Sequence, residues 1–336
     1  QPERTIHSAR RLLGQRFDSQ SVQHLLPSLT YAAVPTEDGM TGLIVGDHCF
    51  SPTEVSAAIL KKVKVLAEAA LGEPVEQAVI SVPAHFDNIQ RKETKRAAEI
   101  AGLEVTRLIN EPTAAALAYG FGAKVGHTIA VYDFGGGTFD ISVLEIDDGV
   151  YNVLATGGDT FLGGNDFNQA IAAWVIDRFK KKTKIDLSFH TLARQRIIDA
   201  AEFAKIQLSS QDVAQISLQN IVPDIDPRAC IDETLSREQM ESLCLPLVER
   251  SLRICRSVFD SAGLHCGEID QIVMVGGMTK MPLIRRKVEE WFLRPPNTSI
   301  NPDEAVGIGA AIQAMALDSD SDAVLLLDVI PLTLSI

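Results

Sequence analysis

The sequence has few cysteines, and their spacing excludes two kinds of structural site. The 336 residues contain five cysteines, an odd number, scattered along the chain and never in a C-x-x-C arrangement. A disulfide framework and a structural zinc site both depend on cysteines at regular, paired spacings. The sequence therefore predicts free thiols and a reducing compartment.

Long apolar runs are missing as well. The longest candidate, VLLLDVIPL at 324–332, is interrupted by Asp328 and Pro331. A helix that crosses a bilayer needs about 20 consecutive apolar residues. We therefore expect no membrane-spanning segment and no membrane partner.

Positive charge is the third thing in short supply. The chain has 31 Lys and Arg against 44 Asp and Glu, a formal net charge of -13. Proteins that bind nucleic acid need clustered cations that displace the counterions of the phosphate backbone. We therefore expect no nucleic-acid partner. The 46% hydrophobic content is ordinary for a globular protein, and 336 residues suit two or more lobes.

Short β-branched runs alternate with helical patterns from about Val75 onwards, which is typical of an α/β domain. The predicted strands cover 78–83, 103–110, 127–134, 138–146 and 269–277. The predicted helices cover 87–102, 112–120, 166–181, 190–208, 236–263 and 281–292. Asp87 with Gln90, and Ser236 with Gln239, have the spacing of a capping box.

Residues 131–140 read VYDFGGGTFD, with three adjacent glycines between two strands. One interpretation is a structural bulge, because glycine permits sharp bends. The other is phosphate binding, in which the exposed N–H groups hold an anion and Thr138 adds a hydroxyl. Asp133 and Asp140 would repel a polyphosphate unless a cation lay between them, so this interpretation implies Mg²⁺ held largely through water.

Three other places carry candidate chemistry. Glu111, between a strand and a helix, is a candidate to orient an attacking water, or else a first-turn glutamate that favours the helix dipole. VGGMTK at 275–280 lies where ligands gather in open α/β sheets, although such turns often use glycine for structure alone. Glu202, Lys205 and Ser209 form a polar stripe on the 190–208 helix, either a binding face or a solvated one.

Seven segments together resemble one family over essentially the whole chain. They are VPAHFDNIQR, LINEPTAAALAYG, VYDFGGGTFDISVLEI, LATGGDTFLGGNDF, MVGGMTKMPLI, INPDEAVGIGAAIQA and VLLLDVIPLTL. In this order they are similar to the nucleotide-binding domain of the DnaK-type heat-shock seventy-kilodalton chaperones. The resemblance implies an α/β, actin-like ATPase fold, with two lobes each on a ribonuclease-H-like sheet and a nucleotide cleft between them.

The resemblance also implies boundaries and partners. Residues 1–122 with 299–322 correspond to the first lobe, 123–298 to the second, and 323–336 to an interdomain linker and the start of a substrate-binding domain. The implied partners are a J-domain co-chaperone, a nucleotide exchange factor, unfolded client peptides, and the chain's own C-terminal domain through Val324 to Asp328. Pro83 and Arg91 match the family's proline switch and relay arginine. The implied location is the bacterial cytoplasm or the mitochondrial matrix.

The resemblance assigns roles to individual residues of an ATPase that uses ATP/ADP and Mg²⁺. The phosphate and catalytic set is Arg10, Glu111, Asp133, Gly135, Gly136, Gly137, Thr138, Asp140 and Thr160, with Asp133 and Asp140 in the Mg²⁺ and water shell. The nucleoside set is Glu202, Lys205, Ser209, Gly276, Gly277, Lys280 and Asp303. Lys280 stands where the family commonly has an arginine that packs on the adenine, so weaker stacking is expected.

This sequence differs from the family's pattern in two places that affect the expected ATP hydrolysis. QPERTIHSARRLLGQRF matches a part of the family that normally follows a glycine hairpin gripping the phosphates, so this hairpin is expected to be absent. Arg10 aligns with a lysine near the γ-phosphate, and a forked guanidinium cannot replace a compact ammonium at the same point.

The alternatives are therefore an ATP-driven chaperone module, a nucleotide-binding regulatory module with impaired hydrolysis, and, least favoured, a sugar kinase or filament protein. Short connections and RPPNTSINPD suggest the HscA branch, which serves iron–sulfur protein maturation.

Overall fold

The computed structural model describes residues 2–120, 126–318 and 325–327. The predicted lobe boundary at 122/123, residues 319–322, Val324 and Asp328 of the linker, and the segment from 329 onwards lie outside the described residues. No helix in the described ranges is long and apolar enough to cross a membrane.

A five-stranded sheet forms the framework of the C-terminal part, in the order β11-β6-β7-β8-β12. Its strands are β6 (His127–Phe134), β7 (Phe139–Asp147), β8 (Val150–Asp159), β11 (Gln271–Val275) and β12 (Leu325–Leu327). β6, β7 and β8 form an antiparallel meander, and the turn between β7 and β8 has positive φ at Asp148 and Gly149. Both outer strands, β11 and β12, run parallel to their neighbours.

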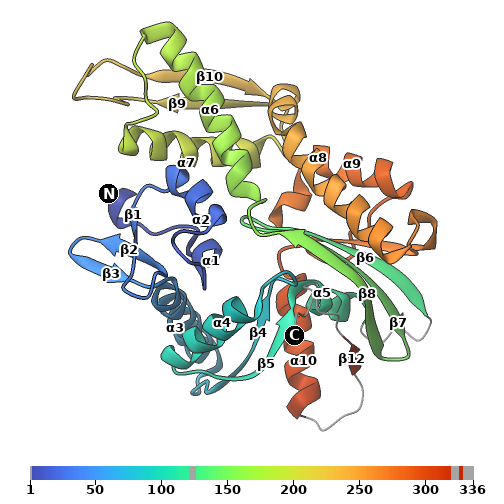
Figure 1. Ribbon diagram of the computed structural model, residues 1–336. Helices are drawn as coiled ribbons and strands as arrows, with labels where there is room; N and C mark the ends of the chain where they lie inside the picture. The colour runs from blue at the N-terminus through green and yellow to red at the C-terminus, as the bar shows by residue number, and fades with distance from the viewer. Residues whose placement is uncertain (1, 121–125, 319–324, 328–336) are drawn as a thin grey trace.

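The helices and the hairpin that accompany this sheet are α6 (Gly164–Thr183), α7 (Thr191–Gln207), β9 (Val213–Leu218), β10 (Ile231–Ser236), α8 (Arg237–Ala262), η3 (Cys266–Glu268), η4 (Gly277–Lys280) and α9 (Pro282–Phe292). α8 packs on this sheet, while α7 packs on α6 and the β9–β10 pair packs on α7 and α8, farther from the sheet (Figure 1). α8 ends at its C-cap Gly263, where the predicted 236–263 helix ends, and contains Pro246. Only half of its predicted capping box forms: Ser236 accepts from the Gln239 N–H, but the reciprocal bond is not present between these two described residues.

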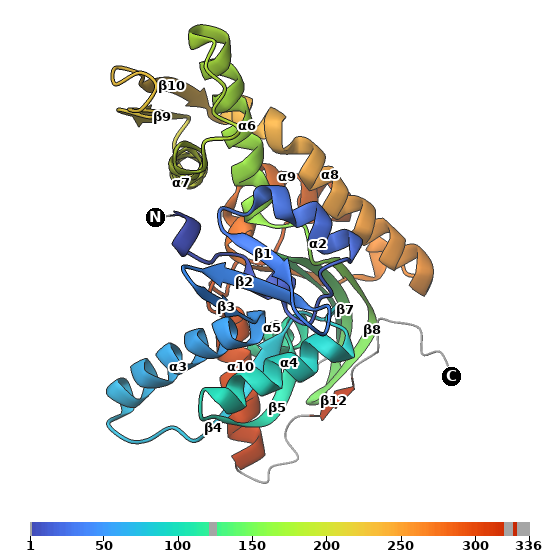
Figure 2. The same ribbon diagram turned by 60° about the vertical axis from the view of Figure 1, so that its left-hand side comes forward.

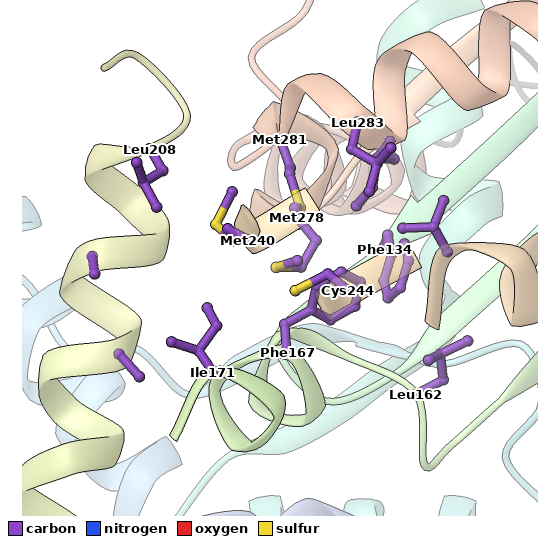
Figure 3. Close-up of a cluster of buried hydrophobic side chains, with 14 of the residues drawn as sticks. Phe134, Leu162, Phe167, Ile171, Leu208, Met240, Cys244, Met278, Met281 and Leu283 are labelled. Atoms are coloured by element: carbon purple, nitrogen blue, oxygen red, sulfur yellow. The ribbon is translucent and has the colours of Figure 1, made fainter. Parts of the chain in front are cut away.

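The largest hydrophobic core lies between the sheet and these helices. Phe134 of β6, Phe139 of β7 and Phe167 of α6 are fully buried and meet edge to face. Figure 3 shows how Met278 and Cys244 join them from η4 and α8. The two strands and α6 are thereby fixed relative to one another at the point where the glycine run leaves the sheet.

The N-terminal part is built from smaller units. They are η1 (Pro2–Arg4), α1 (Ala9–Leu12), α2 (Gln20–Leu25), η2 (Leu26–Ser28), β1 (Ala32–Pro35), β2 (Thr41–Val45), β3 (His48–Phe50), α3 (Pro52–Leu71), β4 (Gln77–Val82), α4 (Asn88–Ile100), β5 (Glu104–Asn110) and α5 (Glu111–Gly120). β1, β2 and β3 form an antiparallel sheet, and β4 pairs in parallel with β5. The sequence patterns predict β4, α4, β5 and α5 but no element before residue 75.

Helix α5 connects the two parts. Eight of its ten residues are buried, and it packs on β6 and β11 of the large sheet. α10 (Ala305–Asp318) lies along α5 and also contacts β4 (Figure 2). The contact is so close that a Cβ added at Gly309 would lie 1.7 Å from the Ala114 carbonyl oxygen. α5 begins at Glu111, so this packing determines where that carboxylate lies.

Candidate functional site

A cavity of about 270 Å³ lies where the N-terminal part meets the edge of the large sheet. Its walls include seven of the predicted phosphate and catalytic residues: Arg10, Glu111, Asp133, Gly135, Gly136, Gly137 and Thr138. Thr160, from the segment between β8 and α6, completes the predicted members. Asp140 lies beside the cavity as the direct cross-strand partner of Asp133.

The glycine run has the geometry of an anion cradle. The Gly135 and Gly136 carbonyls accept from Gly164 N–H and Asn165 N–H at the start of α6, at 3.0 and 2.9 Å. The N–H groups of Gly136 and Gly137 have no hydrogen bond to any residue that the structure describes. An added Cβ at Gly136 would meet nothing within 4 Å. Unpaired N–H groups beside open space and a helix N-terminus are the elements of a phosphate site.

The ionised forms of Asp133 and Asp140, beside the glycine cradle, are electrostatically unfavourable. Burial, then the Glu111 carboxylate, raises the pKa of Asp133 to about 8, against a smaller opposing effect of Arg10. Burial, followed by Asp133 and Glu111, also raises the pKa of Asp140 well above its usual range. One oxygen of Asp140, Oδ1, is buried without a hydrogen-bond partner. A cation near these groups would supply the missing interaction.

The donor set favours a cation held through water. Among the residues described, no group of three His, Cys, Asp or Glu side chains is arranged to hold a metal ion. Mg²⁺ commonly keeps several waters and takes only one or two carboxylates, so Asp133 and Asp140 fit its preferences.

Arg10 and Glu111 form an ion pair at the mouth of the cavity. The side chain of Arg10 is 50% exposed and that of Glu111 only 12%. The guanidinium of Arg10 also lies over the Phe86 ring, 5.5 Å from its centroid. The paired Glu111 carboxylate therefore has one oxygen occupied in the structure.

Sequence reasoning missed several cavity residues. They are Ser8, Arg11, Phe86 and Asn165. Arg11 is the most connected, because it is buried and donates to the Gly137 carbonyl at 2.6 and 2.8 Å and to Asp166 at 2.6 Å. The adjacent arginines 10 and 11 were the only local signal, since the partners of Arg11 lie more than 120 positions away.

The predicted nucleoside residues fall into two neighbouring groups outside the cavity. Lys205 is 8% exposed and donates to the Gly164 carbonyl at 3.2 Å. Burial lowers its pKa, against the opposing effect of Glu202. Ser209, just after the end of α7, donates to the Lys205 carbonyl at 3.4 Å. An added Cβ at Gly164 would approach both Lys205 Nζ and Met278 Sδ, so α7, α6 and η4 converge there.

The second group surrounds the glycine pair. Gly276 has φ +83° and receives support from Pro302, whose carbonyl accepts its N–H at 2.9 Å. A Cβ at Gly277 would lie 3.5 Å from Asp303 Oδ1, and Asp303 pairs with Lys280. The structure thus brings Gly276, Gly277, Lys280 and Asp303 together at the end of β11.

Comparison with protein families gives one match, to the model described as Hsp70 protein, over residues 1–336. The chain belongs to the Hsp70 family. This family consists of ATP-dependent chaperones with an actin-like ATPase fold, and the mixed α/β architecture agrees with it. Its members are ATPases that bind ATP and ADP, generally with Mg²⁺, and generally work with J-domain proteins, nucleotide exchange factors and client peptides.

Two further predicted elements of this Hsp70 chain lie within the described residues. Arg91 adjoins the site, whereas the described part of the linker pairs with Val150–Asn152, at the opposite end of β8 from Thr160. Arg91 donates to the Phe86 carbonyl at 3.1 Å and to Asn110 Oδ1 at 2.6 Å, so it links the loop after Pro83 to the residue before Glu111. Leu325, Leu326 and Leu327 of the predicted linker pair with β8 as strand β12. The remaining linker residues, Val324 and Asp328, are outside the described ranges.

Proposed function

We propose that this chain binds and hydrolyses MgATP and thereby controls a C-terminal peptide-binding domain. The observation that carries the proposal is the pair of buried carboxylates, Asp133 and Asp140, beneath a glycine cradle with free N–H groups. An anion site alone needs no carboxylates, and a carboxylate pair alone needs no cradle. A polyphosphate with a divalent cation uses both.

Each residue of the cavity has a task that its position supports. The N–H groups of Gly136 and Gly137 and the hydroxyls of Thr138 and Thr160 bind phosphate oxygens. Asp133 and Asp140 hold Mg²⁺ through water, and Mg²⁺ when bound neutralises the phosphate charge. Arg10 provides a further positive charge at the mouth of the cavity. Glu111 orients the attacking water when its carboxylate is free of Arg10.

The nucleoside occupies the neighbouring groups. Lys205 on α7 and Ser209 just after it, with the exposed Glu202, offer polar contacts to a ribose. Gly276 and Gly277 let the backbone approach the base closely, and the Lys280 to Asp303 pair lies beside it. Lysine has no planar guanidinium, so base stacking is weaker than an arginine would give.

A second function is a nucleotide-binding regulatory module with impaired hydrolysis. The Arg10 to Glu111 ion pair favours it, because the pair occupies the carboxylate that would orient water. A lysine at position 10 has a compact ammonium and no fork, so it would hold this carboxylate less firmly.

Single-turnover hydrolysis separates the two functions. For an active ATPase, the wild-type chain hydrolyses bound ATP, and Glu111→Gln slows it about a hundredfold because water is no longer oriented by a carboxylate. For the regulatory module, the wild type is inactive and Arg10→Lys restores turnover. Ordinary and equal rates for the wild type and Arg10→Lys would contradict the regulatory module, and no hydrolysis in any variant would contradict the ATPase.

The proposal also covers the linker, the relay residues, the partners and the location of the protein. The linker from Val324 to Asp328 transmits the nucleotide state, and Pro83 with Arg91 relays it from the cavity. J-domain and exchange-factor partners act on this chain, and its clients include iron–sulfur proteins, as in the HscA branch. A reducing compartment, either the bacterial cytoplasm or the mitochondrial matrix, agrees with the five free cysteines.

A further inference from the structure

A second, larger cavity of about 1150 Å³ lies on the other side of Arg11 from the phosphate cavity. α2 and η2 of the N-terminal part form one wall, while α6, α7 and α8 of the C-terminal part form the others. Figures 1 and 2 both show α2 facing α6 and α8. None of the predicted nucleotide residues lines this cavity.

Part of the α6 wall of the cavity is apolar. Ala172, Ala173 and Ile176 recur on the helix face that lines the cavity. The large side chains of α6, Phe167 and Phe179 among them, point into the main core instead. Leu25 of α2 and Leu247 of α8 close the other sides. The result is a pocket somewhat larger than the usual small-molecule site, with an apolar stretch set among polar and charged walls.

One positive charge in the wall has no counterion among the described residues. Arg250 pairs with Asp159, Arg11 with Asp166 and Lys180 with Asp186. Asp177 pairs with Lys181. Arg194 of α7 has no hydrogen bond or ion pair from its side chain to the described residues, and burial lowers the pKa of its guanidinium. Among the charged residues of the wall, it is the guanidinium left to receive an anion.

We propose that this cavity binds a small organic anion with an apolar body, with its acidic group on Arg194 and its body along Ala172, Ala173 and Ile176. Carboxylate, sulfonate and phosphate-ester head groups all fit this chemistry. Contact with the apolar stretch of α6 contributes affinity for the body of the ligand, and the Arg194 guanidinium selects ligands with a negative charge.

Occupancy of the cavity is coupled to the phosphate site, a part of the inference that rests on the proposed function. Arg11 lines both cavities and donates to Gly137 of the glycine cradle. Asp159 and Phe161 line the large cavity, and Thr160 between them lines the small one. A ligand that touches both parts of the molecule favours one arrangement of the two, and nucleotide affinity changes reciprocally.

The anionic dye 1-anilinonaphthalene-8-sulfonate is a suitable probe, because it joins a sulfonate to an apolar aromatic body. Fluorescence titration of the intact protein is expected to show one saturable site. Arg194→Gln removes the charge and Ala173→Trp fills the space, and each should weaken dye binding about tenfold or more. Ala173 is exposed, so the tryptophan does not disturb the core. Arg253→Gln, on an exposed part of α8 outside the cavity, is the control and should bind as the wild type does.

Wild-type dye affinity in both Arg194→Gln and Ala173→Trp would overturn the site, because the dye would then lie elsewhere, for instance on the exposed apolar residues of α3. The coupling is tested by measuring MgADP affinity with saturating dye, which should change about threefold or more in the wild type and not in Arg194→Gln. Unchanged MgADP affinity in the dye-bound wild type would overturn the coupling. Absence of any MgADP binding would refute the proposed function, while the dye titration would still decide the site.

Discussion

Gly309→Ala is expected to destabilise the protein by about 3 kcal/mol or more. The added Cβ would lie 1.7 Å from the carbonyl oxygen and 2.3 Å from the carbonyl carbon of Ala114. Both are backbone atoms of α5, so no side-chain rotation can relieve the clash. α10 must move away from α5, which opens the buried surface between them. Urea denaturation should show the loss as a lower midpoint.

Gly307→Ala is the matched control on the same helix. An added Cβ at Gly307 meets nothing within 4 Å, and the position is exposed. Alanine lowers the entropic cost of the helix, so this variant should gain about 0.5–1 kcal/mol. Similar midpoints for the two variants would show that α5 and α10 are not packed as described. Because α5 begins at Glu111, Gly309→Ala should also weaken nucleotide binding.

Asp133→Asn is expected to stabilise the ligand-free protein at high pH. The native pKa of Asp133 is about 8, above the usual value of 3.8. A carboxyl whose pKa is raised by folding binds its proton more tightly in the native state. The stabilising contribution of the protonated Asp133 side chain is therefore complete below pH 4. It decreases as the pH rises, and it is lost once the pH passes the native pKa of about 8. Asparagine does not titrate, so the advantage of the variant grows between pH 5 and pH 9, by about 4 kcal/mol.

Thermal unfolding in EDTA at pH 5, 7 and 9 measures this difference. Asp224→Asn, at an exposed position, is the control and should change little at any of the three pH values. A gain for Asp133→Asn that is the same at pH 5 and pH 9 would contradict the burial argument. A lower melting temperature for the variant at pH 9 would contradict it more strongly.

Elements with strong local signals were predictable from the sequence. The 127–134 strand is found with the predicted bounds, and the Asp87 and Gln90 capping box forms with both hydrogen bonds. β1, β2 and β3 have three to five residues each, too short for a periodic pattern to stand out. α3 was missed although Ser51 and Glu54 form a capping box, a signal that the sequence does carry.

The candidate site was predictable where its functional residues are adjacent in the sequence. The glycine run and its flanking aspartates are contiguous, so their meeting in one cavity follows from a single hairpin. Arg11 and Phe86 were not predictable, because each reaches the cavity through the tertiary fold. Lys205 shows a third case: helical periodicity placed it on a polar stripe beside exposed Glu202, but packing against Gly164 buries it. Its interpretation as part of a solvated face is therefore wrong.

The central claim is a nucleotide site between the glycine cradle and the buried carboxylates, and calorimetric titration of the protein with MgADP tests it most directly. The account predicts one site per chain with a Kd below about 100 μM, or about −5.5 kcal/mol. Binding should weaken markedly when EDTA removes Mg²⁺, because Asp133 and Asp140 then face the phosphates without a cation. No binding heat and no thermal stabilisation at millimolar MgADP would contradict the claim.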